Sequence, residues 1–271
     1  MIYDTDYKMD FIQIITLGLI QGITEFLPVS SSGHLVLVSI LLGWQDQGLL
    51  MDIAAHAGSL LAVMFYFRKQ LREMVAAVLH PGKSENAQTL NLLSSIAIAT
   101  VPIMLAGILF ADFIETYLRT TYVVATTTIL FALILAFADK TAKCEHDEYH
   151  LCWKGVLFIG VAQIFALIPG TSRSGVTITA GMLMGLDKVA AARFSFLLSI
   201  PAILAAILYK VLQISTTQIQ FDPVAVFSVF LISGVVAYIC IEAFIRFVNT
   251  IGMMPFVIYR IILGILLFVF I

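Results

Sequence analysis

The chain alternates long apolar runs with short polar breaks, and this pattern predicts membrane-spanning helices. A helix needs roughly 20 mostly apolar residues to cross a bilayer. Six uninterrupted apolar runs approach that length, at residues 52–67, 90–110, 121–138, 190–213, 221–246 and 253–271. We therefore expect about six transmembrane helices.

Two further apolar stretches are broken in the middle. Residues 11–43 are interrupted by "LPVSSSGH", and residues 155–185 by "IPGTSRSGVT". Each half is too short to cross a bilayer alone, so two short helices joined by irregular backbone fit better than a full crossing. Such backbone survives at membrane depth only where it is buried in protein or lines a wet cavity. We predict two re-entrant helical hairpins.

The two broken stretches are copies of one another. "SSSGHLVLVSILLG" aligns with "SRSGVTITAGMLMG" at an offset of 142 residues, close to half the chain. Three candidate spans follow each copy, and an odd number of spans makes the two repeats antiparallel. We predict an all-α polytopic membrane protein, a single membrane domain over 1–271, with an inverted-topology repeat at about 11–140 and about 153–271.

Basic residues predict which way this domain lies in the membrane. Cytoplasmic loops carry an excess of Lys and Arg, and this places both termini outside and makes residues 68–89 a cytoplasmic loop. The first hairpin then enters from the outside and the second from the inside, so their tips can meet near mid-membrane. The nine basic residues assigned inside are Arg68, Lys69, Arg72, Lys83, Lys140, Lys143, Lys154, Lys188 and Arg246, against Lys8, Arg119 and Lys210 outside.

The composition supports a membrane protein and argues against other classes. The chain is 61% hydrophobic and 12% charged, with a mean hydropathy of +1.02. Soluble domains carry roughly 25% charged residues, and one core of this size could not bury so much apolar surface. The formal net charge is −2 and no basic cluster occurs, so we expect no nucleic-acid partner.

The segment "CEHDEYHLC" is a candidate metal site of a weaker kind. Cys144, His146, His150 and Cys152 lie close together in it. Their spacing matches no common zinc pattern. We expect a solvated polar loop in which these residues meet by coincidence, and metal binding is the alternative.

The first hairpin tip gathers groups suited to acid–base and nucleophilic chemistry. Gln21 and Glu25 lie one helical turn apart and so share a face. The charge of Glu25 is costly in lipid unless it is paired with a cation such as Arg173 or Arg260, or bound to a metal. His34 adds a group that titrates near neutral pH. The serines between them could also simply cap the next helix.

The second tip, "PGTSRSGVT", is suited to binding an anion. Small residues open a helix there, with hydroxyl groups on both sides of Arg173. Helix N-termini offer free N–H groups and a positive dipole end, and arginine adds a bidentate cation. A packed Ser/Gly helix contact is the alternative, but it leaves Arg173 unexplained. Together, the two tips suit phosphoryl transfer, in which positioning and charge stabilisation provide most of the catalysis.

Over essentially its whole length, the chain resembles the undecaprenyl-diphosphate phosphatase family of the bacitracin-resistance type. "QGITEFLPVSSSGH" is similar to the family's (E/Q)xxxE motif and serine–histidine turn, and "PGTSRSGVTIT" is similar to its PGxSRSxxT motif. "SFLLSIPAILAA" and "PFVIYRIILG" also look family-like.

The resemblance implies a multi-pass enzyme of the bacterial cytoplasmic membrane with interlocked inverted repeats and an outward-facing site. Its substrate would be the C55 isoprenyl diphosphate of cell-wall assembly, and its products the monophosphate carrier lipid and phosphate. The expected partners are this lipid, the bilayer and a second copy of the chain in a homodimer. A divalent cation, Mg2+ or Ca2+, would assist. Glu25 would bind it, with Asp52 as a second carboxylate because Gln21 replaces the first glutamate of the motif.

We assign hypothetical roles on this basis. Glu25 binds the metal or acts as general base, and either Ser31 or His34 attacks the terminal phosphorus. Arg260 reaches the phosphates or forms a structural ion pair. Arg173 holds the diphosphate and completes the catalytic group. The remaining phosphate- and substrate-binding candidates are Gln21, Ser30, Gly170, Ser172, Ser174 and Thr177. A transporter or flippase for an isoprenyl phosphate lipid is the alternative function, because inverted repeats with broken helices are typical of transporters.

Overall fold

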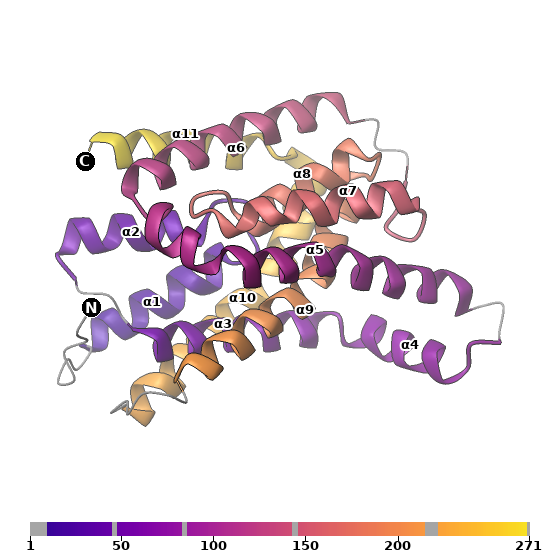
Figure 1. Cartoon of the computed structure of the whole chain (residues 1–271), viewed down its shortest axis with the longest axis horizontal. Coiled ribbons are helices and arrows are strands. Elements are labelled where there is room, and N and C mark those ends of the chain that lie inside the picture. The colour runs from indigo at the N-terminus through magenta and orange to yellow at the C-terminus, as the bar shows by residue number, and fades with distance from the viewer. Residues whose placement is uncertain (1–9, 45–47, 83–85, 143–145, 215–221, 270–271) are drawn as a thin grey trace.

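A computed structural model shows an all-helical bundle (Figure 1). It describes residues 10–44, 48–82, 86–142, 146–214 and 222–269, and these ranges contain no strand. The helices are α1 (Phe11–Thr24), α2 (Ser31–Leu42), α3 (Leu49–Tyr66), α4 (Arg68–Leu79), α5 (Ala87–Tyr117), α6 (Thr121–Thr141), α7 (Trp153–Gln163), the short 3₁₀ helix η2 (Ile164–Leu167), α8 (Arg173–Leu183), α9 (Lys188–Ile214), α10 (Pro223–Ile251) and α11 (Met254–Val269).

Both predicted hairpins are present, and they point toward each other. α1 and α2 form the first, and α7, η2 and α8 form the second. α1 runs inward from the end of the bundle at which α11 finishes, whereas α7 runs inward from the opposite end (Figure 1). The tips touch, because the Ser174 hydroxyl donates to the Leu27 carbonyl at 2.9 Å. Which end faces the cytoplasm stays a prediction.

The long apolar runs form helices of spanning length in five cases. α3, α5, α6, α9 and α10 are each long and apolar enough to cross a membrane. The sixth predicted span, at 253–271, differs. Its described part is α11, a shorter apolar helix of 16 residues.

The expected loop at 68–89 is partly helical, which corrects the sequence analysis. α4 covers Arg68–Leu79 and follows α3 after a single residue, Phe67. Gln70, Met74 and Ala77 are buried on one face of α4, and the helical spacing of these positions explains why the segment folds. The hydrophilic segment that follows ("HPGKSENAQ") is too polar and rich in turn residues to continue the helix.

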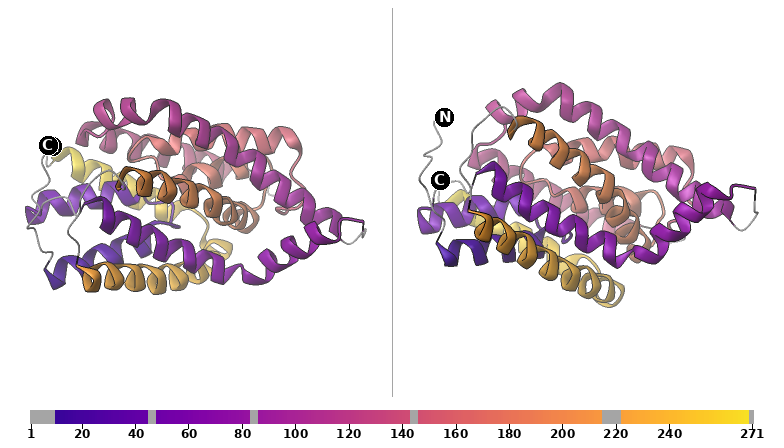
Figure 2. Two further views of the ribbon diagram at one scale, coloured as in Figure 1. Left: turned by 60° about the horizontal axis from the view of Figure 1, so that its bottom comes forward. Right: turned by 90° about the horizontal axis from the view of Figure 1, so that it is seen from below.

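Each hairpin packs against helices from the other half of the chain. α1 packs against α10, α7 packs against α5, and α6 packs against α11. α3 contacts both α9 and α10, so it lies at the centre of this exchange (Figure 2). The exact bounds of the two repeats stay a prediction. The interleaving means that helices of each half are covered by helices of the other half.

The crossing of α3 and α10 depends on small residues. A Cβ on Gly58 would lie 2.1 Å from the Phe230 carbonyl oxygen, and a Cβ on Gly234 would lie 3.1 Å from the Gly58 carbonyl oxygen. Beside them, the hydroxyls of Ser59 and Ser233 are hydrogen-bonded at 2.9 Å. Such close backbone approach with buried hydroxyls is the usual way in which helices pack in a membrane, where water does not drive them together.

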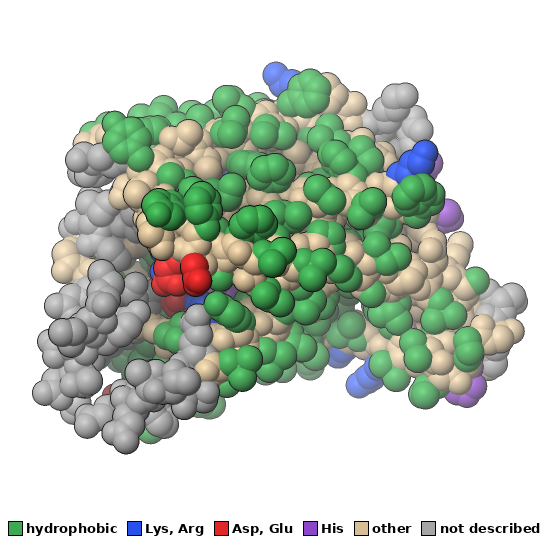
Figure 3. All heavy atoms as spheres, viewed as in Figure 1, with side chains coloured by type: hydrophobic (Ala, Val, Ile, Leu, Met, Phe, Trp, Pro, Cys, Tyr) green, Lys and Arg blue, Asp and Glu red, His purple; other side chains and the backbone are tan. Residues whose placement is uncertain are grey.

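The outer surface is largely apolar, as expected for a protein surrounded by lipid. Large hydrophobic side chains cover most of the face shown in Figure 3, and the acidic side chains on that face gather in one place. Among the most exposed are Leu109, Ile108, Val224, Leu212 and Phe227. A patch of this extent in a soluble protein would cause aggregation.

The α3–α10 crossing generates a stability prediction. We expect Gly58→Ala to lower the free energy of unfolding by roughly 2 kcal/mol or more, because the added methyl overlaps a backbone carbonyl that cannot move aside. Gly107→Ala on α5 is the control, since a Cβ there meets nothing closer than 3.9 Å. The thermal midpoint of detergent-purified protein measures both. Equal midpoints would contradict the packing described.

Candidate active site at the two hairpin tips

The two hairpin tips have the same local structure. Ser30 precedes α2 with φ of 73°, and Ser172 precedes α8 with φ of 68°. In each tip the serine hydroxyl accepts from the backbone N–H three residues later, Gly33 at 3.3 Å and Gly175 at 3.2 Å. Both serines are therefore helix caps, the alternative considered for the first tip. Their left-handed backbone is unusual for serine and marks both turns as strained.

Glu25 lies at the centre of the polar residues of the first tip. Its carboxylate forms an ion pair with Arg173 at 2.9 Å and accepts from the Gln21 amide at 2.8 Å. The side chain is only 8% exposed, so Arg173 provides the compensating charge that a buried carboxylate needs. His56 Nε2 lies 3.8 Å from the same carboxylate. Gln21 thus serves as a donor to Glu25.

Arg173 has a donor left over for a ligand. Its Nη2 binds Glu25, but its buried Nη1 has no hydrogen-bond partner in the part of the chain that the structure describes. The same is true of the buried Thr171 hydroxyl within those ranges. Arg173 is the first residue of α8, so the free N–H groups of the helix start lie beside it. Unpartnered buried donors at a helix N-terminus suit an oxyanion.

His34 is held at both ring nitrogens. Nδ1 lies 2.7 Å from the Ser30 carbonyl, which can only accept, so this nitrogen carries a proton. In the neutral ring Nε2 is then an acceptor, and the Tyr259 hydroxyl lies 2.6 Å from it. The two rings also stack, with centroids 5.5 Å apart. The sequence analysis did not single out Tyr259; the only available signal was its place beside Arg260 in "PFVIYRIILG".

Arg260 connects the backbones of both tips. It is fully buried, and its guanidinium donates to the carbonyls of Pro28 at 3.4 Å, Gly170 at 3.1 Å and Thr171 at 2.9 Å. A fourth bond goes to the Thr128 carbonyl at 3.2 Å.

Arg260 belongs to no ion pair among the described residues, so the predicted structural ion pair is absent there. Gly175 leaves room for the guanidinium of Arg260, because a Cβ on residue 175 would lie 2.7 Å from Arg260 Nη1.

Other residues that were predicted to contact the substrate form hydrogen bonds within the protein. Thr177 bonds to the Arg173 carbonyl at 2.9 Å and to the Ser195 hydroxyl at 2.6 Å. Ser174 lies 3.2 Å from the Ser172 hydroxyl and donates to Leu27, as described above. These residues shape the second tip, and their direct contact with a phosphate stays a prediction. Ser31 is half-buried at the start of α2.

Glu25 and Asp52 do not form the predicted pair of metal ligands. Asp52 forms an ion pair with Lys210 at 2.9 Å, while Glu25 is held by Arg173 and Gln21. The described residues contain no group of three or more His, Cys, Asp or Glu side chains placed to hold a metal ion. A shared site for Mg2+ or Ca2+ does not fit this arrangement, so we derive no step through a metal.

The "CEHDEYHLC" segment is more integrated in the fold than a solvated loop. Glu148 is buried and binds Arg193 on α9, and the His146 backbone pairs with Gly185 and Asp187. His150 bonds to the neighbouring Asp147. Cys152 is exposed, and Cys144 lies outside the described residues.

These features define a class of protein: a polytopic helical membrane protein in which the tips of two helical hairpins bring an acid, a histidine and a buried arginine together. A family model described as bacitracin resistance protein BacA matches residues 14–266. The chain belongs to this family, as the sequence motifs predict.

The contacts of Arg260 generate a prediction. We expect Arg260→Met to lower the free energy of unfolding by roughly 3 kcal/mol or more, because it leaves several buried carbonyls without donors. Arg246→Met is the matched control. Arg246 is exposed, and within the described part of the chain its one ion pair is with Glu242 on its own helix, so its loss should change little. Thermal midpoints of the purified variants compare the two. Equally stable variants would show that Arg260 does not hold the tips.

Proposed function

We propose that this protein hydrolyses undecaprenyl diphosphate to undecaprenyl phosphate and inorganic phosphate. Family membership supports a role in bacitracin resistance, because an enzyme that consumes the diphosphate lipid removes the target that bacitracin sequesters. The observation that best supports the reaction concerns Arg173 at the start of α8. Its buried Nη1 has no hydrogen-bond partner among the described residues, while its Nη2 is fixed on Glu25. A terminal phosphoryl group is the kind of anion that this arrangement would bind.

In the proposed mechanism, Arg173 Nη1 and the first N–H groups of α8 hold the oxygens of the terminal phosphoryl group. They also stabilise the negative charge that spreads over these oxygens in the transition state. Glu25 fixes the orientation of Arg173, and Gln21 fixes Glu25 in turn. Because both Glu25 oxygens already accept bonds, a positioning role suits this carboxylate better than that of a general base.

The nucleophile comes from the first tip. Either Ser31 Oγ attacks the terminal phosphorus and its proton passes to His34 Nε2, or His34 Nε2 itself attacks with its lone pair. In both cases the bond to the bridging oxygen breaks with release of the isoprenyl monophosphate. Water then cleaves the phosphoryl-enzyme and releases phosphate. His34 Nδ1 stays bonded to the Ser30 carbonyl, which leaves Nε2 with the lone pair. Tyr259 must give up its bond to Nε2 if this atom is to attack or accept a proton.

The direct test uses purified protein with C55 or shorter isoprenyl diphosphates, with and without Mg2+ or Ca2+. We expect Arg173→Ala, His34→Ala and Glu25→Gln each to reduce phosphate release by at least about a hundredfold, the scale for losing a transition-state contact. Arg246→Ala should retain activity. Normal turnover in any of the three would remove that residue from the mechanism, and lipid binding without phosphate release would favour the flippase alternative.

A second prediction concerns Tyr259. Removing only its hydroxyl in Tyr259→Phe should raise phosphate release up to about fivefold and leave the thermal midpoint unchanged, because Nε2 no longer has to break one hydrogen bond of ~1 kcal/mol before it reacts. Tyr238→Phe is the control, because Tyr238 lies against Phe65 and Tyr66, away from the tips. Unchanged activity in Tyr259→Phe would mean that the contact with His34 plays no part in turnover.

A further inference from the structure

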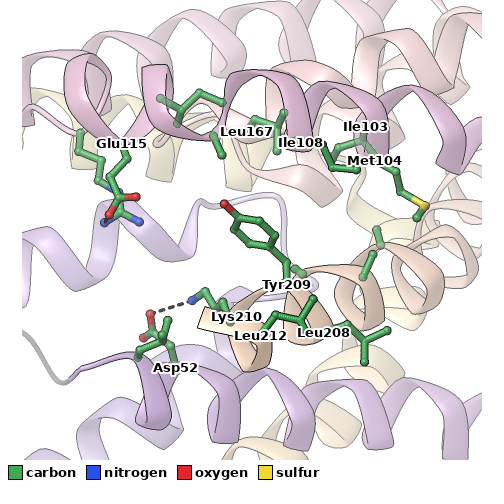
Figure 4. A pocket seen from close by; sticks show the side chains of 18 residues that line it. Asp52, Ile103, Met104, Ile108, Glu115, Leu167, Leu208, Tyr209, Lys210 and Leu212 are labelled. Carbon is green, nitrogen blue, oxygen red and sulfur yellow. Dashed lines mark hydrogen bonds and ion pairs between the residues drawn. The ribbon is translucent and has the colours of Figure 1, made fainter. Parts of the chain in front are cut away.

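A cavity of about 560 Å³ lies between α5 and α9 (Figure 4). Its walls are mostly apolar and include Ile103, Met104 and Ile108 of α5, and Leu208 and Leu212 of α9. Leu167 of η2 and Asp52 of α3 also line it. None of the predicted site residues of the two tips is among the residues that line this cavity, so the roles proposed for them do not account for it.

The cavity lies where a hydrocarbon chain could enter from the bilayer. Met104, Ile108, Leu208 and Leu212 are all exposed on the outer surface as well as lining the cavity. α5 and α9 are both of spanning length, so the gap between them opens at the depth of the lipid chains. Apolar walls that face lipid make entry of a hydrocarbon chain favourable, whereas a charged headgroup would be excluded from the depth of the cavity.

Polar side chains lie at only one end of the cavity. Lys210 reaches across from α9 to Asp52 on α3 (Figure 4). Glu115 of α5 forms an ion pair with Arg119, which lies just beyond the end of that helix. The Tyr209 side chain points into the space between the helices (Figure 4). The cavity is thus amphipathic, as a site for a lipid with a polar head must be.

Two residues of the lining are linked along the chain to residues of the candidate active site. The carbonyl of Asp52 binds His56 Nδ1 at 2.8 Å, and His56 Nε2 lies 3.8 Å from Glu25. Leu167 lies three residues before Gly170, whose carbonyl binds Arg260. Both α3 and the segment that follows η2 thus lead from the cavity to residues of the two tips.

We infer that the α5–α9 cavity holds the first isoprene units of the substrate's hydrocarbon chain. This inference rests on the proposed function and adds a chain subsite to it. If each carbon atom takes about the 30 Å³ that one water molecule takes in the liquid, the cavity has room for roughly 18 carbon atoms, or three to four isoprene units. The rest of a longer chain extends into the bilayer between α5 and α9.

Chain length is the variable that tests this subsite. For wild-type protein, KM for phosphate release should fall as the substrate grows to about four isoprene units and then level off. Filling the cavity with Gly107→Leu or Ala206→Phe should raise KM on the order of tenfold for a four-unit diphosphate and less than about twofold for a one-unit diphosphate. Ile239→Phe is the control, because Ile239 is an exposed residue on α10 outside the cavity.

The outcomes separate the sources of a chain in this cavity. If a bilayer lipid occupies it, the filling variants will change KM equally for short and long substrates or not at all, and the inference is overturned. If wild-type protein releases no phosphate from any substrate, the proposed function fails. Binding affinities of the one-unit and four-unit diphosphates for wild-type and filled proteins then test the subsite alone, and equal losses for both ligands would overturn it.

Discussion

Carbonyl groups released by the two helix breaks lie inside the bundle, and the structure depends on giving them donors. Backbone at membrane depth has no water to bond to, so each such carbonyl needs a partner within the protein. One side chain meets most of this need. Arg260 reaches from α11 to the carbonyls of both tips and to Thr128 of α6. Its buried charge is offset by carbonyl dipoles, and the same bonds hold the two tips in fixed register.

The ion pair between Glu25 and Arg173 is the second interaction that holds the two tips together. Glu25 and Arg173 come from opposite hairpins, and each makes burial of the other tolerable. The pair uses only one side of the guanidinium, so a donor stays directed into the site. The arrangement is strained at Ser30 and Ser172, whose left-handed backbone aims both helix starts toward the same centre. Fixed donors of this kind reduce the reorganisation that a reaction requires.

The sequence was most informative where a local pattern has a single physical meaning. Apolar runs too short to span, broken by proline and serine, predict hairpins, and the matching Ser-x-Ser-Gly turns predict that their tips are alike. Arg173 was also one of the two arginines expected to pair with the carboxylate of Glu25.

Contacts between distant helices could not be predicted in this way. Several contacts depend on three-dimensional packing between segments far apart in the chain. They are the hydrogen bond of His34 with Tyr259, the ion pair of Asp52 with Lys210, and the bonds of Arg260 to four carbonyls. The helix at Arg68–Leu79 was missed for a different reason. Its charged residues suggested a loop, while its buried face is narrow.

The exchange of helices between the two halves also sets the order in which this protein can be completed. A ribosome delivers α1 and α2 first, yet α1 packs on α10, and the carbonyl of Pro28 waits for an arginine on α11. Until those last helices insert, the first hairpin holds Glu25 and His34 without the neighbours that fix them. The nascent chain therefore carries these side chains without their final partners, and the candidate site is complete only when synthesis is nearly finished.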